Sequence, residues 1–154
     1  MKPKQLLRDT EGASLLEFAL TAPMFFLFMF GLLQVAMMLW AQIGLQHGVE
    51  TASRCASISD IAVKQGSLNP ATNPTPCYNA NGYAAANISK VKSFAAANSY
   101  GFNPPVSTFS VSLTAATGTA PACNLISASY PFTAIHYLYS ITLTASSCYP
   151  TVAS

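Results

Sequence analysis

Charged residues are scarce in this chain, at 8% of 154 residues, against about 25% in an ordinary soluble domain. After Glu50 the only acidic residue is Asp60. Glycoside hydrolysis needs two carboxylates facing each other across the scissile bond, whereas Glu50 and Asp60 are expected on a single helix. With a net charge of +2 and no basic cluster beyond the N-terminus, nucleic acid is not expected as a partner.

Motifs for metals, nucleotides and nucleophilic catalysis are missing as well. The sequence contains no C-x-x-C pair, no Walker loop and no G-x-G-x-x-G, each of which would indicate a metal or phosphate site. The only candidate bases for a catalytic serine are His47, expected to be solvated at a helix end, and His136, expected to pack in a sheet among aromatic residues. We therefore predict that the protein is not an enzyme and uses no metal or other cofactor.

Apolar sequence, by contrast, is abundant near the N-terminus. Residues 18–46 carry no charge. A helix of this length extends roughly 43 Å at about 1.5 Å per residue, against about 30 Å of bilayer hydrocarbon. Three basic residues precede the run and only Arg54 follows it closely, which predicts a cytoplasmic N-terminus and export of the remainder.

A cleaved secretory signal is the alternative interpretation of this run, but its apolar region would be only about 7–15 residues long. A retained membrane span beginning near Phe18 is favoured, with Phe26 on its apolar face. Pro23 is expected to weaken one helical hydrogen bond. Gly31 is a candidate for close approach between neighbouring helices, and Trp40 is placed where an interfacial aromatic anchor is expected.

Past the span, the helical pattern is expected to continue, with Glu50 and Arg54 paired across one turn. Prolines and glycines predict a loop over residues 64–82. A short amphipathic helix follows within residues 83–101. Alternation in TFSVSLT and YSITLTASS predicts strands, and ACNLISASYPF predicts a weaker strand that stops near Pro131. The predicted fold is α+β: a long N-terminal transmembrane helix continuing into a small exported domain with one short helix and an antiparallel sheet of about three or more strands.

Four cysteines, Cys55, Cys77, Cys123 and Cys148, all follow the span. An even number in an oxidising compartment predicts two disulfides, and four cysteines allow three connectivities. We prefer Cys55–Cys77, which would tie the loop to the helix, and Cys123–Cys148, which would link adjacent strands. Free thiols are the second interpretation and a metal site the third, because closely spaced cysteine pairs are missing.

The N-terminal residues carry a family resemblance. RDTEGASLLEF, residues 8–18, resembles the processing site of a type IV pilin-like precursor, in which a short basic leader ends in glycine and a glutamate stands fifth in the product. LWAQIGLQHGVETASR, directly after the span, resembles the corresponding segment of TadE-like pseudopilins of the Tad (Flp) pilus system. ASYPF and SITLTASS resemble the C-terminal strands of that family more loosely.

The resemblance implies cleavage by a prepilin peptidase between Gly12 and Ala13. It implies a cytoplasmic leader over 1–12, a transmembrane helix over 13–46 and an exported α+β domain over 47–154. Glu17 would then lie one helical turn from the new N-terminal amine. A carboxylate inside hydrocarbon is costly unless it is paired or protonated, so Glu17 is expected to pair with such an amine and set the register between helices. Snorkelling to the headgroups is the alternative.

The implied role is that of a minor pilin or pseudopilin acting in pilus assembly, surface adherence and biofilm formation. It would be a single-pass protein of the bacterial inner membrane with a periplasmic C-terminal domain. Its expected partners are the prepilin peptidase, other Tad pilins and pseudopilins, the inner-membrane assembly platform and the lipid bilayer. The resemblance leaves open whether the protein is TadE-like, TadF-like or TadG-like. It also leaves open whether the protein enters the pilus fibre or only primes assembly. An unprocessed, membrane-anchored binding or adhesion module is the alternative function.

Overall fold

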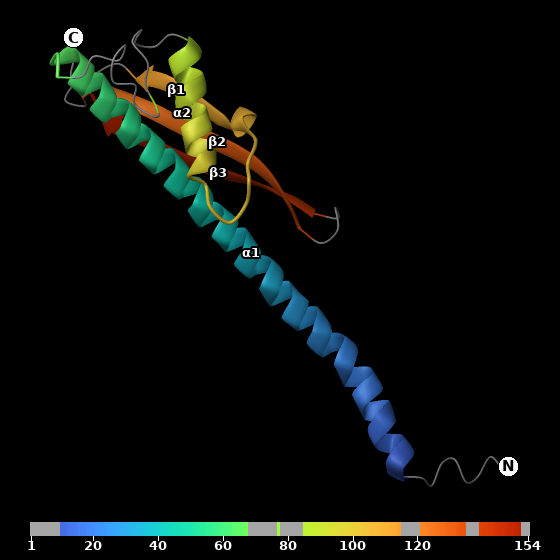
Figure 1. Cartoon of the computed structure of the whole chain (residues 1–154). Helices are drawn as coiled ribbons and strands as arrows, with labels where there is room; N and C mark the ends of the chain where they lie inside the picture. Colours follow the sequence, from blue (N-terminus) through green and yellow to red (C-terminus); the bar gives the residue numbers. More distant parts are fainter. Residues whose placement is uncertain (1–9, 68–76, 78–84, 115–120, 135–138, 152–154) are drawn as a thin grey trace. The chain divides into compact units, whose positions relative to one another are not determined.

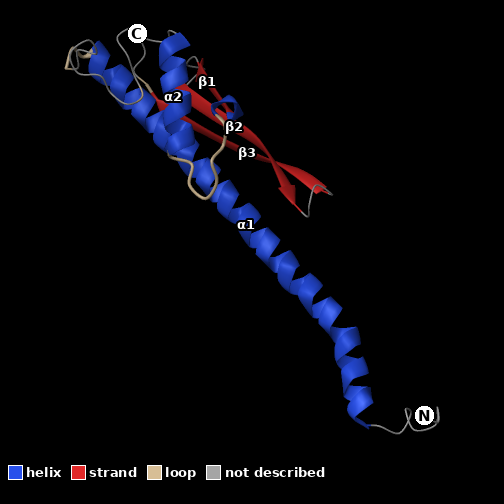
Figure 2. Ribbon diagram, turned by 45° about the vertical axis from the view of Figure 1, so that its right-hand side comes forward, coloured by secondary structure: helices blue, strands red, loops and turns tan. Residues whose placement is uncertain are grey.

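A computed structural model describes residues 10–67, 77, 85–114, 121–134 and 139–151. Its elements are α1 (Thr10–Lys64), α2 (Ala85–Ala97), a 3-10 turn η1 (Val106–Thr108), and strands β1 (Phe109–Thr114), β2 (Cys123–Ala134) and β3 (Tyr139–Pro150). Figures 1 and 2 show this order along the chain. The predicted α+β fold, with one long N-terminal helix, one short helix and a three-stranded antiparallel sheet, is confirmed.

The chain divides into two units, Met1–Met37 and Met38–Ser154. In the first unit, the described residues belong to the N-terminal part of α1 and leave their large apolar side chains exposed. The second unit contains the rest of α1, α2 and the sheet, together with the whole buried core.

The end of α1 is set by a glycine. Gly66 has φ +69°, a left-handed conformation that only glycine adopts without strain. The backbone N–H of Gly66 donates to the Val63 carbonyl (3.1 Å) and that of Ser67 donates to the Ala62 carbonyl (3.0 Å). These two bonds form a Schellman motif, which satisfies carbonyls that the last helical turn leaves without partners. The predicted loop therefore starts close to where the sequence placed it, although most of that loop lies outside the described residues.

The sheet has the order β1-β2-β3, with each neighbouring pair antiparallel. Phe109 is opposite Ala128, which is opposite Ala145, and all three are buried. The next row, Ser110, Ser127 and Ser146, belongs to the other face because successive side chains in a strand point to opposite sides. The sheet is therefore apolar on the face toward the core and hydroxyl-rich on the other.

The prediction that the second strand stops near Pro131 is wrong. β2 continues to Ala134, and Pro131 is opposite Thr142 of β3. β1 ends its pairing with β2 at Phe109, opposite Ala128, so beyond that point β2 has a partner on one side only. A proline, which lacks an N–H, is tolerated at such an open edge.

The expected Glu50–Arg54 pair is also not formed. The Gln46 side chain donates from Nε2 to Glu50 Oε1 at 2.9 Å. The Arg54 guanidinium instead lies 5.9 Å from the ring centroid of Tyr149 on β3, within the range of a cation–π contact. The tertiary partner on the sheet has taken the place of the helical neighbour.

One continuous core joins α1, α2 and the sheet. α1 contributes residues at helical spacing, and α2 contributes Val91 and Ala95, as the sequence period predicts. The fully buried or nearly buried apolar residues are Ala41, Leu45, Val49, Ala52, Ala56, Cys77, Val91, Ala95, Phe109, Ile126, Ala128, Leu143 and Ala145. The core therefore begins at Ala41, within the segment that the sequence assigned to the membrane.

Candidate processing and membrane-assembly site

The predicted cleavage site lies in the first turns of α1. The helix starts at Thr10, so both Gly12 and Ala13 are helical residues, while residues 1–9 of the expected leader lie outside the described residues. Gly12 is exposed, and a Cβ added there would meet no other atom within 4 Å. Glycine at this position is therefore not required by packing in the single chain.

Glu17 is exposed on α1, between Leu16 and Phe18, which are also exposed. Its backbone carbonyl accepts a hydrogen bond from the Thr21 hydroxyl at 3.0 Å. Hydroxyl bonding of this kind leaves a helix intact but bends it easily, and Pro23 follows two residues later within the same helix. The structure thus places a carboxylate on an apolar helical surface that no other described part of the chain covers.

The predicted span keeps this exposed apolar character as far as Met37. Ring contacts run along one side of the helix: Phe25 and Phe26 meet edge to face with centroids 5.9 Å apart, and Phe26 and Phe30 stack at 6.3 Å. A Cβ at Gly31 would meet nothing within 4 Å. A neighbouring helix could therefore pack closely against Gly31, since no described residue of the same chain occupies that space.

Among the described residues, α1 is the one helix that is long and apolar enough to cross a membrane, with a mean hydropathy of 2.1 over an 18-residue window. This statement rests on the length and composition of the helix. The long apolar helix and the disulfide-bonded C-terminal domain are consistent with a membrane anchor followed by an exported domain.

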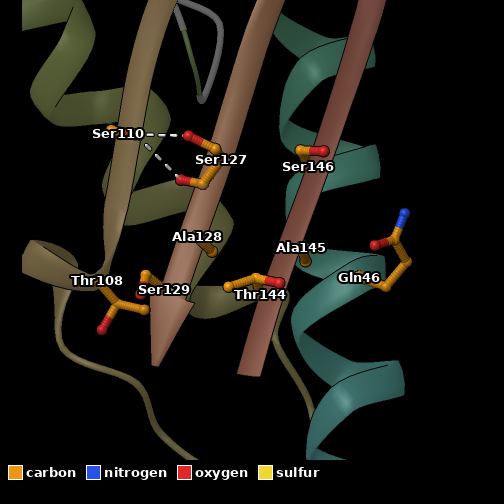
Figure 3. A pocket seen from close by; sticks show the side chains of 9 residues that line it. All are labelled: Gln46, Thr108, Ser110, Ser127, Ala128, Ser129, Thr144, Ala145 and Ser146. Carbon is orange, nitrogen blue, oxygen red and sulfur yellow. Dashed lines mark hydrogen bonds between the residues drawn. The ribbon is translucent and has the colours of Figure 1, made fainter. Parts of the chain in front are cut away.

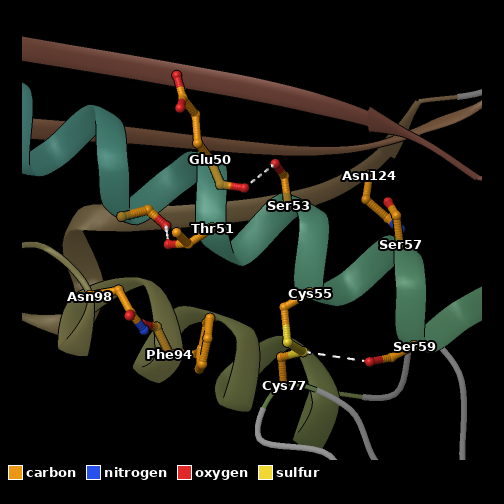
Figure 4. Close-up of a disulfide and its surroundings, with 11 residues drawn as sticks. Glu50, Thr51, Ser53, Cys55, Ser57, Ser59, Cys77, Phe94, Asn98 and Asn124 are labelled. Atoms are coloured by element: carbon orange, nitrogen blue, oxygen red, sulfur yellow. Dashed lines mark hydrogen bonds between the residues drawn. A yellow bond between two sulfur atoms is a disulfide. The ribbon is translucent and has the colours of Figure 1, made fainter.

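The structure joins Cys55 to Cys77 and Cys123 to Cys148, with Cα atoms 6.2 Å and 5.5 Å apart. Both separations are usual for disulfides. Figure 4 shows the first of these bonds, with Ser59 beside it; the Ser59 hydroxyl is 3.6 Å from Cys77 Sγ. One disulfide fixes residue 77 against α1, and the other joins β2 to β3.

Sequence reasoning missed a polar seam between α1 and the sheet. Ser57 on α1 donates to the Tyr149 carbonyl and accepts from Asn124 Nδ2, both at 2.9 Å. One turn earlier, the hydroxyls of Ser53 and Ser147 are 2.9 Å apart. Figure 4 shows Ser57 and Asn124 side by side. The i, i+4 spacing of the two helical serines was the available signal, because that spacing places both on one face.

The seam ends at a buried carboxylate. Asp60 Oδ2 accepts a hydrogen bond from the Thr151 hydroxyl at 2.6 Å and lies 3.5 Å from Lys64 Nζ. A charge that is buried but paired and hydrogen-bonded avoids most of the desolvation cost of an isolated one. Asp60 is thus used to hold the end of β3 to α1, and Glu50 lies elsewhere, bonded to Gln46.

Sequence reasoning also missed two glycines of α1. They allow the C-terminal end of α2 and the turn after it to lie close to α1. A Cβ at Gly44 would overlap the Tyr100 carbonyl oxygen, and one at Gly48 would overlap the Ser99 hydroxyl. Beside them, His47 Nδ1 lies 3.0 Å from the Asn98 carbonyl oxygen. His47 is exposed, as expected, while His136 lies outside the described residues.

The hydroxyl-rich face of the sheet contains an open hollow of about 470 Å³. Figure 3 shows its lining, in which the Ser110 and Ser127 hydroxyls are 2.7 Å apart. The lining residues are Gln46, Thr108, Ser110, Ser127, Ala128, Ser129, Thr144, Ala145 and Ser146. No ionisable side chain is among them, so this hollow supplies no side-chain acid or base. In the part of the chain that the structure describes, no group of three or more His, Cys, Asp or Glu residues could hold a metal ion.

Comparison with known proteins gives one positive result. The model of the TadE-like protein family matches residues 12–54, which begin at the predicted cleavage site and include the apolar helix and its first buried turns. No curated protein and no solved structure matches the chain. Over residues 12–54, the chain is therefore similar to the TadE-like protein family.

Proposed function

We propose that this protein is a minor pilin or pseudopilin of a Tad (Flp) pilus system, processed by a prepilin peptidase after Gly12 and acting in pilus assembly. The match of residues 12–54 to the TadE-like family supports a role in Tad pilus assembly, and we extend this role to surface adherence and biofilm formation. The observation that carries the proposal is the unburied first part of α1. From Leu15 to Leu33 its large apolar side chains stay 37–78% exposed.

Such a surface needs a partner. Large exposed apolar surfaces indicate a membrane or a protein interface, and a uniformly apolar helix of this length fits a bilayer. In the proposed function, lipid covers the helix while the protein is stored in the inner membrane, and helices of other pilins cover it after assembly. Residues 1–12 then form the cytoplasmic leader, and the sheet domain lies in the periplasm.

Processing requires α1 to open locally at its start. A peptidase binds its substrate in an extended form, whereas Gly12 and Ala13 lie within the helix. Glycine inside a helix costs about 1 kcal/mol relative to alanine, and the first helical turn has no intrahelical partners for its N–H groups. Gly12 therefore both lowers the cost of unwinding and lets the enzyme approach the backbone closely.

After cleavage, Glu17 lies four residues from the new amine at Ala13. A lone carboxylate in the hydrocarbon region costs several kcal/mol, so pairing with an amine is favourable. Since Glu17 is exposed, a neighbouring subunit has access to it. Such a pair would fix the axial register between helices, as a single buried polar residue does in a coiled coil.

Intact-mass measurement of the membrane-extracted protein tests processing. With the cognate peptidase present, we expect a protein that begins at Ala13, and without it a protein that keeps residues 1–12. Finding the uncleaved form in both strains would contradict the proposal and favour an unprocessed binding or adhesion module.

A second experiment separates assembly from snorkelling. The Glu17→Ala variant should be inserted and cleaved normally yet support few or no pili, because the register contact is lost. Glu50→Ala is the matched control, since it removes a carboxylate of the same helix outside the proposed span. Normal piliation in Glu17→Ala would show that the carboxylate only reaches for the headgroups.

A further inference from the structure

A cluster of exposed apolar residues lies on one face of α1, close to the start of the Met38–Ser154 unit. Trp40 and Ile43 on α1 are 60% and 57% exposed, and Tyr100, in the turn after α2, is 46% exposed. We call Trp40, Ile43 and Tyr100 the collar. Its members come from two segments that are far apart in sequence.

The contacts within the collar are close and specific. Gly101 has φ +86°, and a Cβ there would come within 2.7–2.8 Å of Trp40 Cδ1 and Nε1, so the turn after α2 lies directly on the indole. The Tyr100 backbone is seated on Gly44, and its ring lies 5.1 Å from that of His47, centroid to centroid. Positions 40, 43, 44 and 47 share one helical face. The turn thus holds the aromatic side chains in place while leaving about half their surface exposed.

The spacing of charges along α1 indicates what covers this surface. Between Glu17 and Glu50 no residue of the helix is charged. Trp40 follows Glu17 by a helical distance of roughly 35 Å at about 1.5 Å per residue, against about 30 Å of bilayer hydrocarbon. With Glu17 at the cytoplasmic edge of the hydrocarbon, Trp40 is therefore at the headgroup layer on the opposite side. Indole and phenol rings with polar N–H and O–H edges favour that layer.

We propose that the collar binds the lipid headgroup layer on the exported side of the membrane, so that the turn after α2 rests on the bilayer. This contact sets the depth of the exported domain and ends the span near Trp40, before the buried Ala41. The inference rests on the proposed membrane insertion of α1. Tyr100 and Gly101 thereby acquire a role as membrane-contacting residues of the sheet-bearing domain.

Trp40 is the only tryptophan in the chain, so its fluorescence reports on the collar without labelling. The full-length protein is reconstituted into phosphatidylcholine–phosphatidylglycerol vesicles containing lipids brominated at shallow or deep acyl positions. We expect blue-shifted emission, strongest quenching by shallow bromines and weak quenching by aqueous acrylamide. The proposal would be overturned if Trp40 were quenched most strongly by the deep bromines. It would also be overturned if acrylamide quenched Trp40 and the brominated lipids did not.

Extraction of the membranes with alkaline carbonate distinguishes the membrane insertion of α1 from the headgroup contact of the collar. Extraction of the protein would refute membrane insertion itself, and with it the proposed anchor. Retention together with a Trp40 that bromolipids do not quench would refute the collar alone, leaving a neighbouring subunit as its cover.

Two isoleucines offer a matched control. Ile43 and Ile58 are 57% and 58% exposed on the same helix, and only Ile43 is in the collar. Ile43→Ser should reduce shallow-bromine quenching relative to acrylamide quenching by about twofold, because it makes the interfacial surface polar, and Tyr100→Ser should act in the same direction. Ile58→Ser should leave the ratio unchanged. Equal effects of the two isoleucine variants would overturn the proposal.

Discussion

The close approach at Gly44 gives the sharpest prediction for the exported domain. In Gly44→Ala, the new methyl group would overlap the Tyr100 carbonyl oxygen. That oxygen belongs to the backbone, so no side-chain rotation relieves the overlap. The whole turn after α2 has to move away from α1, which separates Gly101 from Trp40 and lengthens the hydrogen bond between His47 and the Asn98 carbonyl.

The magnitude follows from three contributions. Overpacking a well-packed site costs about 1–3 kcal/mol, and losing the hydrogen bond of His47 adds about 1 kcal/mol. Alanine is about 1 kcal/mol better than glycine inside a helix, which offsets part of the loss. We expect Gly44→Ala to lower the free energy of unfolding by about 1–3 kcal/mol, or on the order of 4–12 °C in melting temperature for a domain of this size.

Thermal unfolding in mild detergent, followed by Trp40 fluorescence and near-ultraviolet circular dichroism, measures this change. Gly31→Ala is the matched control, since a Cβ at Gly31 meets nothing within 4 Å and the helix gains the same propensity. The control should melt at or slightly above the wild-type temperature. If Gly44→Ala melts with the control and its Trp40 emission is unchanged, the turn does not rest on Gly44 and the reasoning fails.

Two further predictions concern the links between α1 and the rest of the domain. Replacing Cys55 and Cys77 together by serine opens a loop of 22 residues and should cost about 3 kcal/mol in unfolding free energy; non-reducing peptide mapping of the wild type should recover this pair, and four free thiols would refute it. Ser57→Ala removes the hydrogen-bond partner of the buried Asn124 Nδ2 and should cost about 1–3 kcal/mol. Ser89→Ala, at an exposed site on α2, should change the melting temperature little, and equal effects would contradict the seam.

Local patterns in the sequence were sufficient to predict the elements and their order. The uncharged apolar run predicted a long helix, because within a membrane a single segment satisfies its own backbone groups only as a helix. Alternation with a period of two specified β1 and β3, and it assigned Phe109 and Leu143 to the core face, where both are buried. The leader, the cut at Gly12 and the role of Glu17 are implied by the resemblance of residues 8–18 to a pilin-like processing site, and they stay predictions until the mass and piliation experiments are done.

Contacts between distant segments were not accessible in this way. Pro131 was expected to end β2, but an open edge beside the shorter β1 tolerates it. Arg54 was expected to pair with Glu50, but Tyr149 from the sheet offers a ring instead.

The sequence by itself therefore determined a long apolar helix, a short helix and three strands, because hydrophobic period and turn residues act within a few positions of each other. Only the tertiary structure decided where along α1 the exposed apolar surface ends and the buried core begins, which is at Ala41. It also decided that a turn some sixty residues later lies on Trp40. Close approach of two backbones depends on which glycine faces which carbonyl, and that relation exists only once the chain has folded.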